Sequence, residues 1–337
     1  MKAAFVQCHG QADSIQIGVV PDPQTSSSDP DEVIIAVNVS AVNPIDTYIR
    51  SGSVGGDLPS PWIPGCDFAG RVLAVGAMVT AFKVGDRVWG SNQSLAGRQG
   101  TLAEKLAVHQ QWVYPIPDCI SDEAAAGGAL TGITAHLGLH LHAQLESEET
   151  VFVNGGTGGV GSAVVQLARR AGARVITTVG DEQKVTSAKE LGAEHVINYR
   201  SGDVHASIKQ AAEEYGGIDV WFETLRTPEP ERVIPLMSRR GRIVVMAGRN
   251  ARPVLPVGPL YVADLRILGF AMFNASPEEQ RQSAEAINLA GIASEFQPII
   301  GRRFALNESV AAHQLQEDNT LHGAGTLTGK IVVNIAG

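Results

Sequence analysis

The chain has 337 residues, of which 44% are hydrophobic and 18% charged, and its formal net charge is −9. This length accommodates two domains of ordinary size, and the composition is that of a globular protein. The acidic balance, with no basic stripe along the chain, argues against nucleic acid or an anionic membrane surface as the main partner.

The cysteines and the N-terminus indicate a reducing compartment. Cys8, Cys66 and Cys119 are odd in number and widely spaced, which fits neither a disulfide framework nor a paired zinc motif. The opening residues MKAAFVQCHG lack the long apolar region of a signal peptide. Residues 124–143 carry no Asp, Glu, Lys or Arg, but His, Thr and Gly dilute them, so we expect a buried helix. We predict a cytoplasmic protein.

Two kinds of sequence pattern follow one another along the chain. The first third contains short strand-like runs such as DEVIIAVNVSAV and AGRVLAVG between turn residues, which is typical of a largely antiparallel, barrel-like domain. Beyond residue 124, apolar strands alternate with helical segments, and this predicts a doubly wound parallel α/β sheet. From about residue 297 the chain again shows the strand-like pattern of the first third. We therefore predict one domain from 1–124 with 297–337, and a second from 125–296.

A glycine-rich turn is the most informative motif. In TVFVNGGTGGVGSAVVQLARRAG, a Val-containing strand precedes Gly156, Gly158 and Gly161, and an apolar-periodic helix follows them. In a dinucleotide site the first glycine makes the tight turn, the second admits the pyrophosphate, and the third lets helix and strand approach. The helix N-terminus then faces the phosphate. We assign cofactor binding to the run Gly156, Thr157, Gly158, Gly159, Val160 and Gly161.

The next strand favours NADPH over NADH. An NAD site usually has an acidic residue at the end of this strand, but RVITTVG ends in Thr, Val and Gly. Asp181 and Glu182 lie just beyond, where such residues commonly start a helix. Lys184 is placed to meet a 2′-phosphate; the alternative is a solvated helix lysine.

Motifs over almost the whole chain resemble one known family. They include SAVNPIDTYIRSG, PGCDFAGRVLAVG, FKVGDRVWG, NGGTGGVGSAVVQLAR, LGAEHVINYR and GAGTLTGKIVV. In these motifs the chain resembles the zinc-independent quinone oxidoreductases (the zeta-crystallin type) of the medium-chain dehydrogenase/reductase superfamily. The resemblance implies a GroES-like catalytic domain, a Rossmann domain, a homodimer joined through Rossmann sheet edges, and NADPH-driven reduction of quinones or related conjugated carbonyls.

The resemblance also implies roles for individual residues. Asn43, Asp46 and Tyr48 match positions that line the quinone and nicotinamide cleft. The remaining matches are cofactor positions: Thr131 beside the nicotinamide, Tyr199 with Lys184 near the 2′-phosphate, Gly248 and Phe270 near the nicotinamide ribose and carboxamide, and Lys330 on the cleft side.

The stretch PWIPGCDFAG raises the question of a metal. Zinc dehydrogenases of the superfamily have Cys at the position of Asn43 and Gly-His-Glu where this chain has Gly-Cys-Asp, so Cys66 alone remains as a soft ligand. His136 and His140 lack a third ligand and are expected to be packed. We predict no metal, a small buried Cys66, and an Asp67 that holds its turn or a neighbouring backbone group, or else bonds Asn43 or substrate.

The NPIDTYIR run carries two interpretations. Asn43 and Tyr48 can donate hydrogen bonds to a developing oxyanion, with Tyr48 as the better proton donor and Asp46 orienting Tyr48 or a water. Alternatively, these residues simply start a helix with Asn43 as the N-cap and Pro44 at its first position. Arg50 is expected to form a salt bridge at the turn.

Other functions remain open. One is NADPH-dependent reduction of the C=C bond of an enone or enoyl thioester, for which Lys83, Arg87 and Arg98 are loose candidates to bind a CoA phosphate. Another is cofactor binding without catalysis. The prediction is a metal-independent NADPH:quinone reductase acting on a small molecule, with neither nucleic acid nor membrane as a partner.

Overall fold

The computed structural model describes residues 1–24, 29–54, 56 and 58–335. The chain forms two compact units. Unit 1 comprises Met1–Leu130, Pro277–Ile292 and Pro298–Gly337, and unit 2 comprises Thr131–Ser276 with Ala293–Gln297. The boundary between them falls inside α2 (Asp122–His136). Among the described residues, no helix combines the length and apolarity needed to cross a bilayer.

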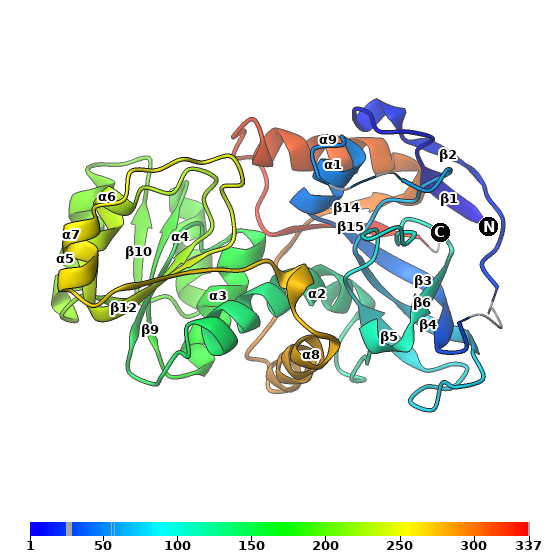
Figure 1. Cartoon of the computed structure of the whole chain (residues 1–337), viewed down its shortest axis with the longest axis horizontal. Coiled ribbons are helices and arrows are strands. Elements are labelled where there is room, and N and C mark those ends of the chain that lie inside the picture. Colours follow the sequence, from blue (N-terminus) through cyan, green and yellow to red (C-terminus); the bar gives the residue numbers. More distant parts are fainter. Residues whose placement is uncertain (25–28, 55, 57, 336–337) are drawn as a thin grey trace. The chain divides into compact units, whose positions relative to one another are not determined.

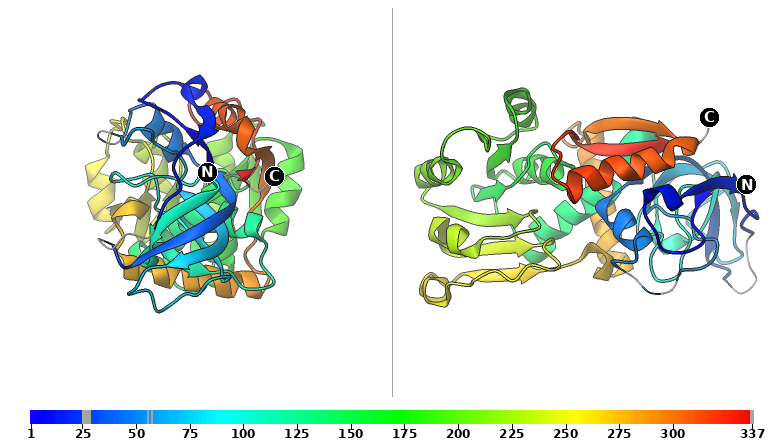
Figure 2. Two further views of the ribbon diagram at one scale, coloured as in Figure 1. Left: turned by 90° about the vertical axis from the view of Figure 1, so that its right-hand side faces the viewer. Right: turned by 90° about the horizontal axis from the view of Figure 1, so that it is seen from above.

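Unit 1 is built on a mainly antiparallel sheet around the long strand β3 (Glu32–Val42), which pairs with β4, β6 and β15. The other strands of this sheet are β4 (Asp67–Val75), β5 (Arg87–Gly90), β6 (Lys105–His109), β7 (Val113–Pro115), β14 (Ile300–Ala305) and β15 (Lys330–Asn334). A separate hairpin joins β1 (Lys2–Phe5) to β2 (Gln16–Val19). Figure 2 shows the orange-to-red C-terminal segment lying against the blue N-terminal strands of this unit.

Besides the first part of α2, unit 1 contains the helices α1 (Pro44–Arg50), α8 (Pro277–Ile292) and α9 (Ser309–Thr320). The expected boundary at residue 297 puts α8 in the other domain, whereas the structure groups α8 with unit 1. The reason is a pair of hydrogen bonds between α8 and strands of unit 1. Asn288 of α8 accepts a hydrogen bond from Trp89 Nε1 at 3.1 Å and donates one to the Pro115 carbonyl at 2.9 Å.

Unit 2 is a six-stranded, fully parallel sheet with the order β10-β9-β8-β11-β12-β13 (Figure 1). Its strands are β8 (Thr150–Val153), β9 (Arg174–Val179), β10 (His195–Asn198), β11 (Ile218–Glu223), β12 (Met237–Val245) and β13 (Arg266–Gly269). The strands β8, β9 and β11 are buried almost throughout, whereas the edge strands β10 and β13 are not. The predicted doubly wound sheet is confirmed, because numbering these strands from β8 gives the Rossmann order 3-2-1-4-5-6.

Helices connect these strands, namely α3 (Gly159–Arg170), α4 (Glu182–Glu190), α5 (Val204–Glu214), α6 (Pro230–Val233) and α7 (Val257–Val262). After β10 the chain returns to the centre of the sheet and forms β11 beside β8. The strand order therefore reverses between β8 and β11, and ligands of open α/β sheets bind outside the carboxyl ends of strands at such a point.

Candidate functional site

The turn after β8 has the geometry of a dinucleotide cradle. Gly156 donates its N–H to the Thr178 carbonyl at 3.0 Å, and Gly155 donates its N–H to Thr178 Oγ1 at 3.1 Å. A Cβ atom at Gly161 would lie 2.1 Å from the Gly155 carbonyl oxygen, and one at Gly156 would lie 2.4 Å from Thr177 Oγ1. Both positions therefore require glycine. The turn ends at Gly158, and α3 begins at the next residue.

One detail of the turn differs from the sequence interpretation. The left-handed residue is Gly155, with φ of +67°, rather than Gly156. Several adjacent glycines can adopt this conformation equally well, so spacing alone could not distinguish them. Gly156 is instead required by its contact with Thr177. Thr157 is buried, and Gly159 and Val160 at the start of α3 are half-buried.

The ends of β9 and β10 bring together the residues predicted to meet a 2′-phosphate. Tyr199 donates its N–H to the Val179 carbonyl at 2.9 Å, and its phenol oxygen lies 2.5 Å from where a Cβ on Gly180 would stand. Asp181 caps α4 by accepting the Lys184 N–H at 2.9 Å, as predicted, and its carboxylate lies 3.5 Å from Lys184 Nζ.

Arg200 also lies in this corner, and the sequence motifs did not predict it. Its charge acts on Asp181, whose pKa is lowered chiefly by the hydrogen bond from the Lys184 backbone and further by the charges of Lys184 and Arg200. Arg200 is exposed and directly follows Tyr199. A basic residue next to a predicted phosphate-side tyrosine was the available signal.

The other predicted cofactor residues of unit 2 lie after the strands β12 and β13 or in helix α2. Gly248, with φ of +86°, follows β12, and Phe270 follows the neighbouring strand β13, so both lie beyond carboxyl ends of the sheet. Phe270 donates its N–H to the Val245 carbonyl at 3.2 Å and packs on His142, with 4.6 Å between ring centroids. Thr131 is buried in α2.

In unit 1, the residues Asn43, Asp46, Cys66, Asp67, Ser91 and Lys330 form a buried polar cluster. Asn43 precedes α1 in extended conformation, and Asp46 accepts its N–H at 2.8 Å, so the predicted helix start at Pro44 is confirmed.

The Asn43 side chain links this helix start to two strands. Its amide Nδ2 donates to Asp67 Oδ2 at 2.8 Å, and its Oδ1 accepts from Lys330 Nζ. Ser91 Oγ donates to Asp67 Oδ1 at 2.6 Å, while Lys330 Nζ also donates to the Val42 carbonyl at 2.8 Å. Asp67 thus bonds Asn43, one of the alternatives left open above, and Lys330, predicted on the cleft side, bonds the same Asn43 side chain.

Burial sets the protonation of this cluster. It raises the pKa of Asp46 to about 7, against a smaller lowering by the Cys66 thiol beside it. Burial likewise raises the pKa of Asp67, which the Lys330 charge opposes. Burial also lowers the pKa of Lys330, which the nearby carboxylates oppose, and raises that of Cys66. A carboxyl with a pKa near 7 holds or releases a proton at neutral pH.

The remaining predicted residues of α1 have distinct environments. Tyr48 is half-buried, whereas Asn43 and Asp46 are fully buried. Arg50 is also fully buried and forms its salt bridge with Glu317 of α9. The expected ion pair exists, but its partner lies 267 positions along the chain.

Few His, Cys, Asp and Glu side chains of the described residues lie close enough together to hold a metal ion. Within the described ranges, the one grouping of His, Cys, Asp and Glu with three ligand atoms within 4.8 Å of one another is Asp29, Asp31 and His109. Cys66 and its two acidic neighbours do not belong to it. The rings of His136 and His140 lie 4.6 Å apart, and burial lowers the pKa of His136 to about 4, with a further contribution from His140.

Comparisons with known proteins cover both units. Residues 29–118 match the family described as alcohol dehydrogenase GroES-like domain, and residues 159–289 match the family described as zinc-binding dehydrogenase. Human quinone oxidoreductase is 32% identical over 302 residues, which cover 90% of this chain and 88% of the human protein.

Two solved structures extend the similarity to the whole fold. An NAD-dependent alcohol dehydrogenase superposes with a TM-score of 0.88 at 26% identity, covering 100% of both chains. A mycobacterial protein complexed with NADPH superposes with a TM-score of 0.83 at 27% identity, covering 99% of this chain and 100% of that one. The expected combination of a GroES-like domain and a Rossmann domain is confirmed.

Proposed function

Because the chain belongs to the quinone oxidoreductase family of the medium-chain dehydrogenase/reductase superfamily, we propose that it is an NADPH-dependent reductase that transfers hydride to a quinone without a metal ion. The observation that carries the metal-free part is the buried amino group of Lys330. It is hydrogen-bonded to Asn43, beside Asp67, within the polar cluster of unit 1.

The nucleotide corner fits NADPH. The glycine cradle suits a pyrophosphate at the N-terminus of α3, and the end of β9 (Thr177, Thr178, Val179, Gly180) has no carboxylate to bind a ribose 2′-hydroxyl. Positive charge in this corner comes instead from Arg200, which follows Tyr199, and from Lys184, whose Nζ lies 3.5 Å from the Asp181 carboxylate. The similarity to an NAD-dependent enzyme makes NADH the necessary comparison in any assay.

The donor set does not fit zinc. A catalytic zinc needs three protein ligands and one open position. In the unit 1 cluster the amino group of Lys330 already lies among the possible ligand atoms and donates to Asn43 Oδ1 and to the Val42 carbonyl. Among the described residues, Cys66, Asp46 and Asp67 do not form a group of three ligand atoms within 4.8 Å of one another.

The side chains of α1 and of its N-cap residue Asn43 have different roles in the proposed reaction. When bound, NADPH supplies the hydride. Tyr48, the half-buried member, donates its hydroxyl hydrogen bond to the substrate oxygen that gains negative charge, and we assign it the catalytic role. Asn43 and Asp46 are fully buried, so we assign them the positioning of α1 and the holding of a proton on the Asp46 carboxyl. A quinone needs no stronger acid, because the added charge spreads into its ring.

No observation favours the enoyl-thioester alternative. The three cations considered for a CoA phosphate each have a partner: Lys83 pairs with Asp86, Arg87 with Asp122, and Arg98 donates to the Asn92 carbonyl. These side chains do not supply a free basic channel.

The edge of the unit 2 sheet supports a homodimer. β13 is the last strand of the sheet, and exposed apolar residues gather on it and on the preceding segment, namely Val254, Leu255, Val257, Tyr261, Val262 and Ile267. An apolar, open edge strand is a site for pairing with a second chain. Light scattering on a size-exclusion column should give twice the chain mass for the wild type and the chain mass for Ile267→Lys; a monomeric wild type would overturn this part.

The function is tested by following NADPH oxidation with an ortho-quinone, with and without EDTA, beside NADH and a simple enone. Metal content is measured on the same preparation. NADPH- and quinone-dependent turnover that persists in EDTA, at far less than one zinc per chain, supports the proposal. Stoichiometric zinc or collapse in EDTA contradicts the metal-free part, and turnover with the enone alone contradicts the quinone part.

A further inference from the structure

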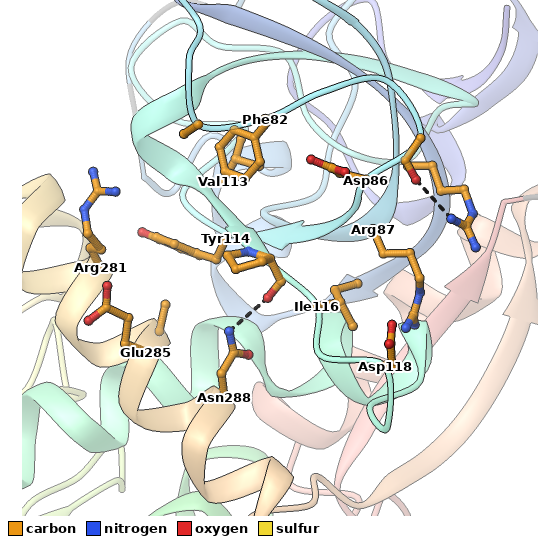
Figure 3. Close-up of a pocket in the computed structure, with 15 residues that line it drawn as sticks. Phe82, Asp86, Arg87, Val113, Tyr114, Ile116, Asp118, Arg281, Glu285 and Asn288 are labelled. Carbon is orange, nitrogen blue, oxygen red and sulfur yellow. Dashed lines mark hydrogen bonds between the residues drawn. The ribbon is translucent and has the colours of Figure 1, made fainter.

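A pocket lies within unit 1, apart from the polar cluster described above. It has a volume of about 690 Å³ and is formed by the β4–β5 connection, β7 and helix α8 (Figure 3). Small-molecule sites commonly have this size and combine an apolar lining with a few polar groups. Here the apolar part comes from Phe82, Val113, Ile116 and Ala284.

The polar group that calls for a ligand is the hydroxyl of Tyr114. This side chain is 3% exposed, and its hydroxyl has no hydrogen-bond partner among the described residues. Its ring is held against Trp89, with 5.0 Å between centroids. In Figure 3 the hydroxyl end points toward the side of α8 from which Arg281 and Glu285 project. A buried, unpaired hydroxyl is costly, so such a group usually has a ligand or an ordered water as its partner.

The charges around the pocket decide which ligand fits. Arg87 is already paired with Asp122 at 2.6 Å, and Asp86 accepts from Lys83 at 2.9 Å. Arg281 is bound only loosely, with its Nε 3.5 Å from Glu278 on the same helix. Burial raises the pKa of Tyr114, so its hydroxyl remains a donor at neutral pH, and Arg281 is the charged group that acts on it.

We propose that this pocket binds a small carboxylate with a single-ring apolar body. Its carboxylate accepts a hydrogen bond from the Tyr114 hydroxyl and faces the Arg281 guanidinium, and its ring lies on Phe82, Val113 and Ile116. Glu285 repels the carboxylate and sets the limit on affinity.

Benzoate, benzyl alcohol and benzylamine are matched probes because they share the ring and differ in charge. Saturation-transfer NMR titration of the full chain should give the tightest binding for benzoate, with a Kd on the order of 1 mM for a ligand of this size. Tyr114→Phe and Arg281→Gln should each weaken benzoate about tenfold, as expected for the loss of a hydrogen bond or charge pair to an anion. Glu285→Gln should tighten it.

The controls separate binding from folding. Tyr261→Phe changes an exposed tyrosine of unit 2, and Arg232→Gln removes an arginine that, like Arg281, pairs with a glutamate of its own helix region; neither should alter benzoate binding. Tyr114→Phe should unfold at the same temperature as the wild type or higher, and should keep the reductase activity, because the lost hydroxyl has no hydrogen-bond partner among the described residues.

Three outcomes would overturn the proposal. The first is the absence of saturable benzoate binding at concentrations up to about 20-fold above 1 mM. The Tyr114 hydroxyl would then have water as its only partner. Tighter binding of benzylamine, or equal binding of benzyl alcohol, would reject an acid. Full benzoate affinity in both Tyr114→Phe and Arg281→Gln would place the ligand elsewhere.

Discussion

The side-chain amide of Asn43 donates a hydrogen bond to the Asp67 carboxylate at 2.8 Å, and 24 positions of chain separate the two residues. The oxygen of the same amide accepts from Lys330, 287 positions away. The amide is thereby fixed in one orientation, and with it the start of the helix that carries Tyr48. One N–H of Asn43 remains after the bond to Asp67, since a primary amide has two donors.

Lys330→Met tests whether the buried amino group of Lys330 supports this arrangement. The change leaves the Val42 carbonyl and Asn43 Oδ1 without their donor, which should lower the free energy of unfolding by about 1–3 kcal/mol. We expect kcat to fall about tenfold or more, because Asn43 is released. Urea unfolding and steady-state kinetics measure the two effects. Lys209→Met, an exposed lysine of α5, is the control. Unchanged kcat would remove Lys330 from the mechanism.

Tyr48→Phe removes only the hydroxyl proposed to contact the substrate oxygen. Loss of one donor to a developing oxyanion typically costs about 10²-fold in kcat. The affinity for NADPH, measured by fluorescence titration, should stay the same. Full turnover in this variant would exclude Tyr48 as a catalytic residue, and Tyr261→Phe serves as the matched control.

Lys184→Ala and Arg200→Ala test cofactor choice. If these cations face the 2′-phosphate, each change should raise the KM for NADPH about tenfold, the usual effect of losing a charged hydrogen bond. The KM for NADH should not change. Lys189→Ala, on the same helix α4, controls for a general loss of positive charge. Equal weakening of NADPH and NADH would contradict the assignment.

The pKa of Asp46 predicts how stability depends on pH. Its folded value of about 7 lies above the value of about 3.9 in an unfolded chain. Between these values the folded state binds more protons than the unfolded state, so this group's contribution to stability is present below about pH 4 and is lost as pH rises through about 7. The whole contribution amounts to about 4 kcal/mol at most.

Asp46→Asn isolates this contribution, because the amide cannot ionise yet keeps an oxygen that can accept the Asn43 N–H. Denaturant unfolding at pH 5 and pH 8 should show a smaller loss of stability for the variant than for the wild type. An identical loss in both proteins would mean that Asp46 is ionised throughout this range.

Local features of the fold were predictable from the sequence. Asp181 caps α4 and Pro44 begins α1, because a cap depends only on residues within one helical turn. The glycine turn was placed for the same reason. The glycine with positive φ was not predicted, because a spacing rule does not distinguish between adjacent glycines that can adopt the same conformation.

The sequence alone predicts the elements and their chemistry: a glycine turn between strand and helix, no acid at the end of the next strand, and a helix start at NPID. Which distant groups meet depends on the tertiary structure. Lys330 reaches Asn43 because β15 pairs with β3, and Arg50 reaches Glu317 through the packing of α1 beside α9. The Tyr114 hydroxyl lacks a hydrogen-bond partner within the described part of the chain because of how β7 and α8 enclose it. Such contacts depend on strand pairing and helix packing over the whole chain, whereas sequence patterns report on neighbours a few residues apart.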